Sequence, residues 1–331
     1  MGEARRLATR LARDIGFSET ETGKVAIVVS EAAANLAKHA REGELLLRRL
    51  EHNGVMGIEV MALDRGPGVT NVAECLRDGY STKAGPGTGL GAIARLSALF
   101  DIHSIPGVGT ALLCRFWSKP LSGSLQSAPL EVGAVCLPKS GEKICGDRWT
   151  IDQGPGRSRI LAVDGLGHSH LAAEASVEAV RIFLDNPRLG PAEMVEAMHA
   201  GLRSTRGAAV GVAEVDIHNK VVRFAGVGNI AGVILSPEGN RNMVSHNGIV
   251  GHNVRKIQEF TYPWPDGGLL VMHSDGLASR WSIDNHRGLA SRHPSLIAGV
   301  LYREFSRGHD DVVVVAAKER SVIDQALSAY Q

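Results

Sequence analysis

Apolar residues recur at helical spacing near the start of the chain. Leu7, Leu11 and Ile15 fit one face of a first helix. A second helix is predicted over about residues 23–40, and its apolar stripe consists of Val25, Val28, Val29, Ala32, Ala33 and Leu36.

Alternating apolar and polar positions follow and predict a small sheet. Two strands, at 44–50 and 55–63, are joined by an Asn-Gly turn. A helix over about 90–99 then precedes a closing hairpin with strands at 101–105 and 110–117. This pattern favours helices packed on one face of a mixed sheet.

The second part of the chain is rich in predicted strands. Two helices, over about 170–186 and 191–205, lie among them. The predicted strands are residues 132–137, 159–163, 210–216, 221–226, 231–235, 269–273 and 311–316. Two sheets packed face to face with helices outside would bury these apolar runs, so the expected fold class is α+β with an α-β-β-α sandwich in this part.

A composition change separates the two parts. Residues 118–129 read SKPLSGSLQSAP, a small, polar and periodicity-free stretch typical of a linker. The length of 331 residues fits two domains. The predicted domains are residues 1–117 and 130–331.

Charge and composition exclude several classes of function. The 36 basic and 35 acidic residues give a net charge of +1, which favours neither nucleic acid nor an anionic membrane as a partner. No stretch has the length of apolar sequence that a membrane span or a signal peptide needs. The four cysteines form no CxxC pair, as expected for reduced thiols. These features predict a soluble cytoplasmic protein.

Three motifs in the first part suggest nucleotide chemistry. Glu31 and Asn35 are four residues apart on one helix face, where the amide oxygen suits Mg²⁺ and the carboxylate can deprotonate a nucleophile. Asp64, in LDRGPGV, could accept a hydrogen bond from an exocyclic amine such as that of adenine. The glycines of KAGPGTGLGAIARL lead into a helix whose N-terminal amides could hold phosphate. Taken singly, a solvated pair, a surface turn and a flexible loop are the alternatives.

Aspartates recur beside glycines or strand ends in the second part. They are Asp147 in CGDRW, Asp164 in LAVDGLGHS, Asp275 in MHSDGLAS, and Asp310 and Asp311 in GHDDVVVV. Burial of the strands would bring these acids to one sheet edge, where they repel one another unless cations neutralise them. Oxygen ligands without His or Cys favour Mg²⁺ or Mn²⁺, and two such ions can activate a shared water. Simple Asp-Gly turns are the alternative.

In their order and spacing, the three motifs of residues 1–117 resemble the GHKL ATPase fold of histidine kinases, chaperone ATPases and anti-sigma-factor kinases. The segments DRGPGV, DGYSTKAGPGTGLG and Gly109-Thr110 are similar to the RsbT-like switch kinases of bacterial stress regulation. The resemblance implies ATP and Mg²⁺ as ligands. No histidine phospho-acceptor motif precedes the domain, and the strand that usually opens such kinases is not visible.

The resemblance also implies roles for individual residues of this domain. Glu31 would be the catalytic carboxylate, Asn35 the Mg²⁺ ligand and Asp64 the residue that recognises adenine. Thr110 would support the adenine end of the site. The residues that would shape the turn and hold the phosphates are Gly66, Gly68, Gly87, Thr88, Gly89, Leu90 and Gly91.

Residues 130–317 resemble type 2C metal-dependent phosphatases of the SpoIIE/RsbX-like branch. The motifs VDGLGH and SDGL carry the resemblance, with support from FAGVGNIAG and NGIVG. It implies two Mn²⁺ or Mg²⁺ ions bound by Asp147, Asp164 and the carbonyl of Gly165, with Asp147 and Asp164 also catalytic. Asp275 and Asp310 would complete the shell of one ion.

Some neighbouring residues depart from the family pattern or have weaker roles. Asp311 is a candidate for support behind the ligands, because the family motif places the ligand at the first acid. Ser169 stands where relatives often have glycine, which could alter the turn beside the metal. His168 fits a contact with substrate or a structural role, and His273 fits packing within its strand.

Fusion of these two domains suggests opposed reactions on one switch. In the families resembled, the target is a STAS-domain anti-sigma-factor antagonist, which the first domain would phosphorylate and the second would dephosphorylate on Ser or Thr. In one alternative, the first domain is a catalytically silent anti-sigma factor that binds a sigma factor and is regulated by the phosphatase. In another, an ATPase is joined to a non-catalytic scaffold. A homodimer is a further expectation, since the ATP domains of some relatives pair.

Overall fold

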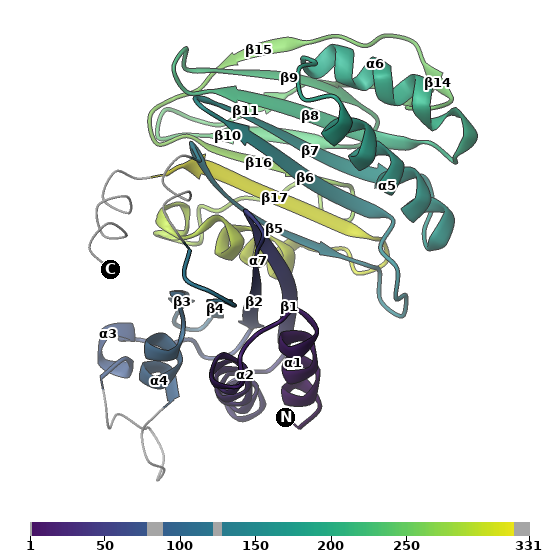
Figure 1. Cartoon of the computed structure of the whole chain (residues 1–331). Helices are drawn as coiled ribbons and strands as arrows, with labels where there is room; N and C mark the ends of the chain where they lie inside the picture. Colours follow the sequence, from purple (N-terminus) through teal and green to yellow (C-terminus); the bar gives the residue numbers. More distant parts are fainter. Residues whose placement is uncertain (1, 78–88, 122–127, 321–331) are drawn as a thin grey trace. The chain divides into compact units, whose positions relative to one another are not determined.

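The computed structural model describes residues 2–77, 89–121 and 128–320, which form two compact units (Figure 1). One unit comprises Met1–Leu125 with Asp284–Arg292, and the other Gln126–Ile283 with His293–Gln331. The predicted linker includes residues 122–127, which lie outside the described part of the chain.

The first unit is a four-stranded sheet with helices. Its strands lie in the order β1-β2-β4-β3. Their bounds are β1 Gly43–His52, β2 Val55–Asp64, β3 Leu99–Ile105 and β4 Gly109–Trp117, and the helices are α1 Gly2–Asp14, α2 Glu19–His39, α3 Val72–Cys75 and α4 Gly89–Leu96. The described pairings are all antiparallel, not mixed as expected, because hairpins link β1 to β2 and β3 to β4.

Helix α2 provides the main apolar face of this unit. It starts at Glu19, earlier than predicted, because the side chain of Ser18 caps its N-terminus by accepting from the Glu21 amide at 3.2 Å. Of the predicted stripe, the four residues from Val25 to Ala32 are buried in the same core as Ile58, Val60 and Leu112 of the sheet, while Ala33 and Leu36 are half-buried.

Two predictions for the other helices of this unit are wrong in detail. In α1, Ala8 and Ala12 are fully buried while Leu7 is 47% exposed, because small alanines allow close packing in the core that α1 shares with α2. Helix α4 ends at Leu96 because Leu99 already begins β3, where it pairs with Arg115.

The second unit contains two larger sheets. One has the order β11-β10-β16-β17-β5, and the other β12-β9-β8-β7-β6 with β15 paired to β9. Their bounds are β5 Leu130–Leu137, β6 Asp147–Gly154, β7 Arg157–Gly165, β8 Ala208–Asp216, β9 Val221–Val227, β10 Ala231–Leu235, β11 Arg241–Met243, β12 Ser245–His246, β15 Phe260–Pro263, β16 Leu269–His273 and β17 Val312–Glu319. The small hairpin of β13 Gly248–Ile249 and β14 Asn253–Val254 forms a separate two-stranded sheet, and Val250 in its turn makes an antiparallel bridge to Ala208 of β8.

Helices cover the outer faces of this sandwich. Helices α5, His170–Asp185, and α6, Pro191–Gly201, lie over the β6–β9 sheet, while α7, Pro294–Phe305, packs on β5 and β17 (Figure 1). One core cluster fills the space between the sheets, and a second joins β7, β8 and β9 to α5 and α6. The four layers confirm the predicted α+β class and the α-β-β-α sandwich.

The sequence interpretation missed β6 and α7. Strand β6 has the sequence DRWTIDQG, whose polar residues hide the apolar pattern of a strand. Every residue of α7 from Pro294 to Leu301 is buried, so it lacks the polar face that marks an amphipathic helix.

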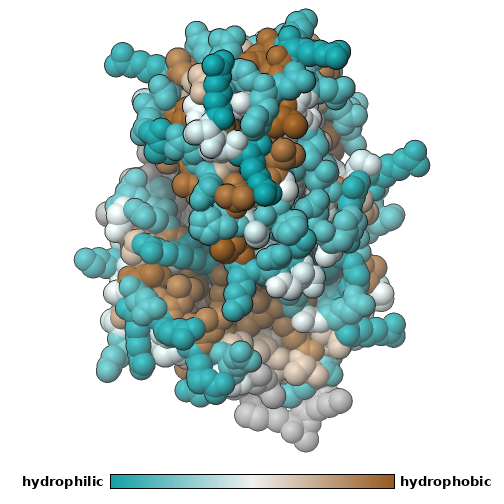
Figure 2. Space-filling view, turned by 90° about the vertical axis from the view of Figure 1, so that its right-hand side faces the viewer, coloured by the Kyte–Doolittle hydropathy of each residue, from teal (hydrophilic) through white to brown (hydrophobic). Residues whose placement is uncertain are grey.

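The surface mixes hydrophilic and apolar residues. Figure 2 shows apolar side chains in patches between hydrophilic ones. Large exposed apolar side chains include Leu7 of α1 and Leu171, Val177 and Leu184 of α5. Among the described residues, no helix combines the length and apolar character needed to cross a membrane.

Candidate functional site

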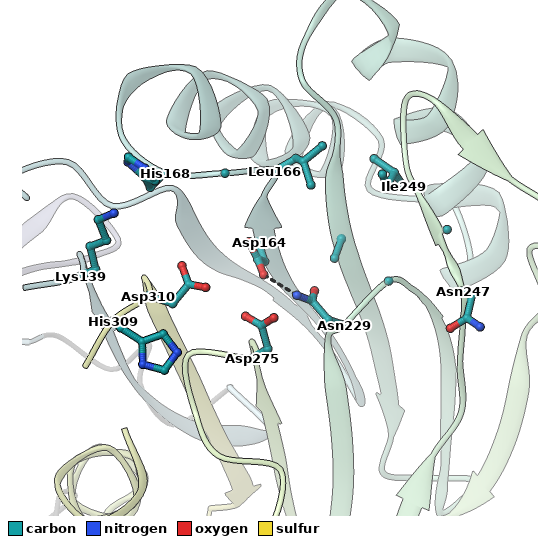
Figure 3. A pocket seen from close by; sticks show the side chains of 14 residues that line it. Lys139, Asp164, Leu166, His168, Asn229, Asn247, Ile249, Asp275, His309 and Asp310 are labelled. Carbon is teal, nitrogen blue, oxygen red and sulfur yellow. Dashed lines mark hydrogen bonds between the residues drawn. The ribbon is translucent and has the colours of Figure 1, made fainter. Parts of the chain in front are cut away.

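Four of the predicted acids gather at one end of the second unit's sandwich. The antiparallel register of β6 and β7 sets Asp147 directly opposite Asp164. Asp275 follows β16 and Asp310 precedes β17, and these two strands are antiparallel neighbours. Asp164, Asp275 and Asp310 line one pocket of about 620 Å³ and point into it (Figure 3).

Asp147 is the buried member of this group. It is 1% exposed, and its Oδ2 accepts a hydrogen bond from Ser274 Oγ at 2.6 Å. Ser274 Oγ in turn accepts from the amide of Val313 at 3.0 Å. This chain of hydrogen bonds links Asp147 to β16 and β17, the neighbouring interior strands that Asp275 follows and Asp310 precedes.

Asp164 is held by a residue that the sequence interpretation did not select. The side-chain amide of Asn229 donates to Asp164 Oδ2 at 2.9 Å, which fixes the orientation of the carboxylate (Figure 3). Asn229 belongs to the motif FAGVGNIAG, so the signal for it was present in the sequence. Gly165 follows Asp164, and an added Cβ there would lie 2.1 Å from the carbonyl oxygen of Ala172, so only glycine fits.

Asp311 supports the loops around the pocket. Its carboxylate accepts from the backbone amides of Lys139 at 2.8 Å and Gly146 at 2.7 Å, and it is 3% exposed. Both oxygens are therefore used to hold the segment between β5 and β6. This placement agrees with a supporting role behind Asp310.

The turn after Asp164 keeps a backbone shape that suits glycine. Ser169 has φ 66° and ψ −147°. An L-residue in this region costs of order 1–3 kcal/mol. Ser169 therefore stands at the start of α5 in a conformation that glycine adopts more readily.

The two histidines considered in this region have different surroundings. His273 is 4% exposed and packed, because its Nε2 accepts from Trp281 Nε1 at 2.9 Å and its Nδ1 lies 2.8 Å from the carbonyl of Ser274. Burial lowers the pKa of His273. His168 is exposed and lines the pocket, with Nδ1 3.5 Å from Glu142.

Burial and neighbouring carboxylates raise the pKa of two acids at the pocket. Burial, together with the charge of Asp164, raises the pKa of Asp147 well above its usual value. Burial first, and then the charges of Asp275 and Asp310, raise the pKa of Asp164 to about 7. Such shifts arise where carboxylates are brought together without a neutralising cation.

The donors fit a hard divalent cation by their chemistry. In the described part of the chain, no three His, Cys, Asp or Glu side chains form a ready-made metal cluster. Asp164, Asp275 and Asp310 nevertheless line one pocket, the charges of Asp275 and Asp310 contribute to the raised pKa of Asp164, and oxygen donors of this kind suit Mg²⁺ or Mn²⁺.

The pKa shifts predict a pH-dependent stability of the metal-free protein. Unfolded Asp164 ionises near pH 3.8, whereas folded Asp164 keeps its proton to about pH 7. The folded state therefore binds more protons in this window, so stability falls as pH rises from about 4 to above 7 and then levels. In EDTA, we expect the Tm to be higher at pH 5.5 than at pH 8 by about 5 °C.

Tryptophan fluorescence can follow this transition, because Trp149, Trp264 and Trp281 lie in the second unit. Asp164→Asn should reduce the difference in Tm between pH 5.5 and pH 8. Added Mn²⁺ should raise the Tm more at pH 8, where protons compete less for the carboxylates. An equal pH response in the wild type and Asp164→Asn would contradict the assignment.

A turn in the first unit surrounds Asp64. Asp64 pairs with Thr110 across β2 and β4, and its Oδ1 accepts from the amides of Gly66 at 2.6 Å and Thr110 at 3.3 Å. Gly109 has φ 142°, and an added Cβ there would lie 2.0 Å from the carbonyl oxygen of Asp64. An added Cβ at Gly68 would meet the carbonyl oxygen of Ile105 at 2.2 Å.

The other residues predicted for nucleotide binding are placed in part. Glu31 and Asn35 are half-buried on α2, one turn apart. Gly89, Leu90 and Gly91 form the first turn of α4, where free amides can bind an anion. Gly87 and Thr88 lie outside the described residues.

Comparison with known proteins matches both units. Residues 1–116 match the histidine kinase-like ATPase domain, and residues 154–320 match stage II sporulation protein E (SpoIIE). The serine/threonine-protein kinase RsbT of Bacillus subtilis is 31% identical over 114 residues, which cover 34% of this chain and 86% of RsbT. The phosphoserine phosphatase RsbX of the same species is 25% identical over 143 residues, 43% of this chain and 71% of RsbX.

A solved structure supports the fold. The PP2C phosphatase domain of SpoIIE from Bacillus subtilis, with a fragment of its regulatory domain, superposes with a TM-score of 0.50 at 17% identity. The superposition covers 95% of this chain and 93% of that one. At this identity, the likeness establishes the fold.

The fold and these matches define a type 2C Ser/Thr protein phosphatase joined to a kinase-like ATPase domain. The chain belongs to the SpoIIE family, and its first unit belongs with the RsbT kinases, as the sequence motifs predict.

Proposed function

We propose that the second unit hydrolyses phosphoserine or phosphothreonine in a protein, using two Mg²⁺ or Mn²⁺ ions. The observation that carries this proposal is the gathering of Asp164, Asp275 and Asp310 in one pocket, with Asp147 buried opposite Asp164. These carboxylates and the carbonyl of Gly165 would hold the ions, which when bound supply positive charge and a water of lowered pKa.

The chain's own residues have separate tasks in this reaction. Asn229 keeps the Asp164 carboxylate oriented, and Ser274 does the same for Asp147. Asp311 holds the loop on one side of the pocket through two backbone amides. These hydrogen bonds hold the carboxylates and the loop in position, which reduces the ordering that ligand binding requires.

We also propose that the first unit binds ATP with Mg²⁺ and transfers its phosphoryl group to a protein. Asp64 and Thr110 would bind the adenine end, and Asn35 the Mg²⁺ ion, while Glu31 would accept the proton of the attacking hydroxyl. The glycine-bounded turn around Asp64 and the half-buried face of α2 support this assignment.

The substrate that fits both units is a STAS-domain anti-sigma-factor antagonist. The relatives are named as a protein kinase and a phosphoserine phosphatase, so the two units would catalyse opposed reactions. The first unit would phosphorylate this protein on Ser or Thr, and the second would dephosphorylate it. The chain would then act as a bidirectional switch in a partner-switching pathway.

Mass spectrometry of a STAS-domain protein incubated with the purified chain tests this function. With ATP and Mg²⁺, we expect a mass gain of one phosphoryl group, and with Mn²⁺ and no ATP we expect its loss from the phosphorylated form. Binding of a sigma factor without any transfer would instead assign the first unit as a silent anti-sigma factor. ATP hydrolysis without transfer to any protein would reject the kinase proposal.

A further inference from the structure

The acidic pocket of the second unit contains one strongly basic side chain. Fourteen residues line the pocket, and they include Lys139 together with the carboxylates Asp164, Asp275 and Asp310. A phosphomonoester carries close to two negative charges at neutral pH, so the carboxylates repel it. Metal ions held by the carboxylates would offset part of this repulsion, and a lysine in the same pocket adds a positive charge that no carboxylate ligand can supply.

The backbone of Lys139 is fixed in place. Its amide donates to Asp311 Oδ1 at 2.8 Å, and Asp311 also holds Gly146 and is nearly fully buried. Because Asp311 directly follows Asp310, the loop that carries Lys139 is tied to the segment that carries a predicted metal ligand. The backbone of Lys139 is therefore held close to the segment that carries Asp310.

The side chain of Lys139 is available to a ligand. It is half-buried and extends along the pocket on the side of His168 and Asp310 (Figure 3). Within the described part of the chain, Lys139 donates a hydrogen bond through its backbone amide, and its ammonium forms no ion pair. Three N–H donors on this group can therefore face a bound anion.

We propose that Lys139 binds the phosphoryl group of the substrate, an inference that rests on the proposed phosphatase function. The ammonium donates hydrogen bonds to non-bridging phosphoryl oxygens and holds the phosphorus atom toward the carboxylates. In the reaction, a water oxygen bonds to phosphorus, the bond from phosphorus to the serine oxygen breaks, and the serine oxygen takes a proton. Inorganic phosphate is the other product and contacts the same ammonium until it leaves.

Lys139→Met tests this assignment, because methionine keeps the apolar stem and removes the charge. A hydrogen bond to a charged group contributes about 1.5–3 kcal/mol, so we expect KM to rise by about 10-fold or more, with a smaller change in kcat. KM should rise by the same factor with a phosphoprotein and with para-nitrophenyl phosphate, because Lys139 contacts the phosphoryl group common to both. Inhibition by inorganic phosphate should weaken in parallel, and Lys139→Arg should restore part of the affinity.

Lys143→Met is the matched control. Lys143 lies in the same loop, is exposed and does not line the pocket, so this variant should keep wild-type kinetics. An unchanged KM in Lys139→Met would overturn the inference, as would a changed Mn²⁺ affinity with an unchanged KM, which would assign Lys139 to the metal site. If the wild-type protein with Mn²⁺ hydrolysed neither substrate, the phosphatase proposal itself would be rejected.

Discussion

Asp164→Asn is expected to lower the phosphatase rate by about 100-fold or more, because it removes a charge that a divalent cation needs. Asp164 faces the pocket, lies opposite Asp147 in the sheet and has a raised pKa, all of which place it at the centre of the negative charge. Asparagine keeps the size of the side chain and can still accept a hydrogen bond from Asn229. The loss should therefore come from cation binding and not from unfolding.

Steady-state kinetics with a phosphoprotein and a Mn²⁺ titration measure this effect. Asp266→Asn is a matched control, since Asp266 belongs to the same unit, is 85% exposed and lies outside the pocket. It should keep wild-type activity and Mn²⁺ affinity. If Asp164→Asn retained wild-type activity and metal affinity, the acidic pocket would not be the catalytic centre.

Glu31→Ala is expected to lower phosphotransfer to the partner protein by about 100- to 10,000-fold, the usual contribution of a general base. Glu31 shares a half-buried face of α2 with Asn35, while Asp64 and Thr110 lie at the ends of β2 and β4. Binding of ATP through Asp64 and Thr110 should therefore change little in this variant. Transfer of radiolabel from ATP and binding of a fluorescent ATP analogue separate these two effects.

Glu19→Ala provides the control for the first unit. Glu19 is an exposed carboxylate in the first turn of the same helix, far along the chain from Glu31. It should keep wild-type phosphotransfer. Phosphatase activity should be unchanged in both variants, and full phosphotransfer by Glu31→Ala would remove Glu31 from the mechanism.

Local sequence patterns predicted most of the elements. The stripe of α2, the Asn-Gly turn between β1 and β2 and strand β10 appear where apolar period and turn chemistry placed them. Strand β6 and helix α7 were missed, because one alternates weakly and the other is apolar on all sides. Both elements are stabilised by packing against their neighbours in the fold, β6 against β7 and α5, and α7 against β5 and β17.

For the acidic site, the sequence indicated the residues and their convergence at one sheet edge, but not the contacts between them. Asp164, Asp275 and Asp310 were found as acids beside strand ends, and the tertiary structure brings them into one pocket. Their pKa shifts could not be predicted, since burial and charge depend on segments distant in sequence. Asn229 belongs to the motif FAGVGNIAG, but its role in orienting Asp164 becomes visible only through the hydrogen bond between the two side chains.

The sequence by itself determined the two families, the main helices and strands, and the acids and glycines of the two candidate sites. These depend on residue type and on spacing along the chain, which are local properties. Only the tertiary structure decided that Asp147 lies opposite Asp164 and that Lys139 is tied to Asp311, 172 residues away. Strand register and long-range hydrogen bonds cause this difference, because they join residues whose separation in sequence carries no information about their distance in space.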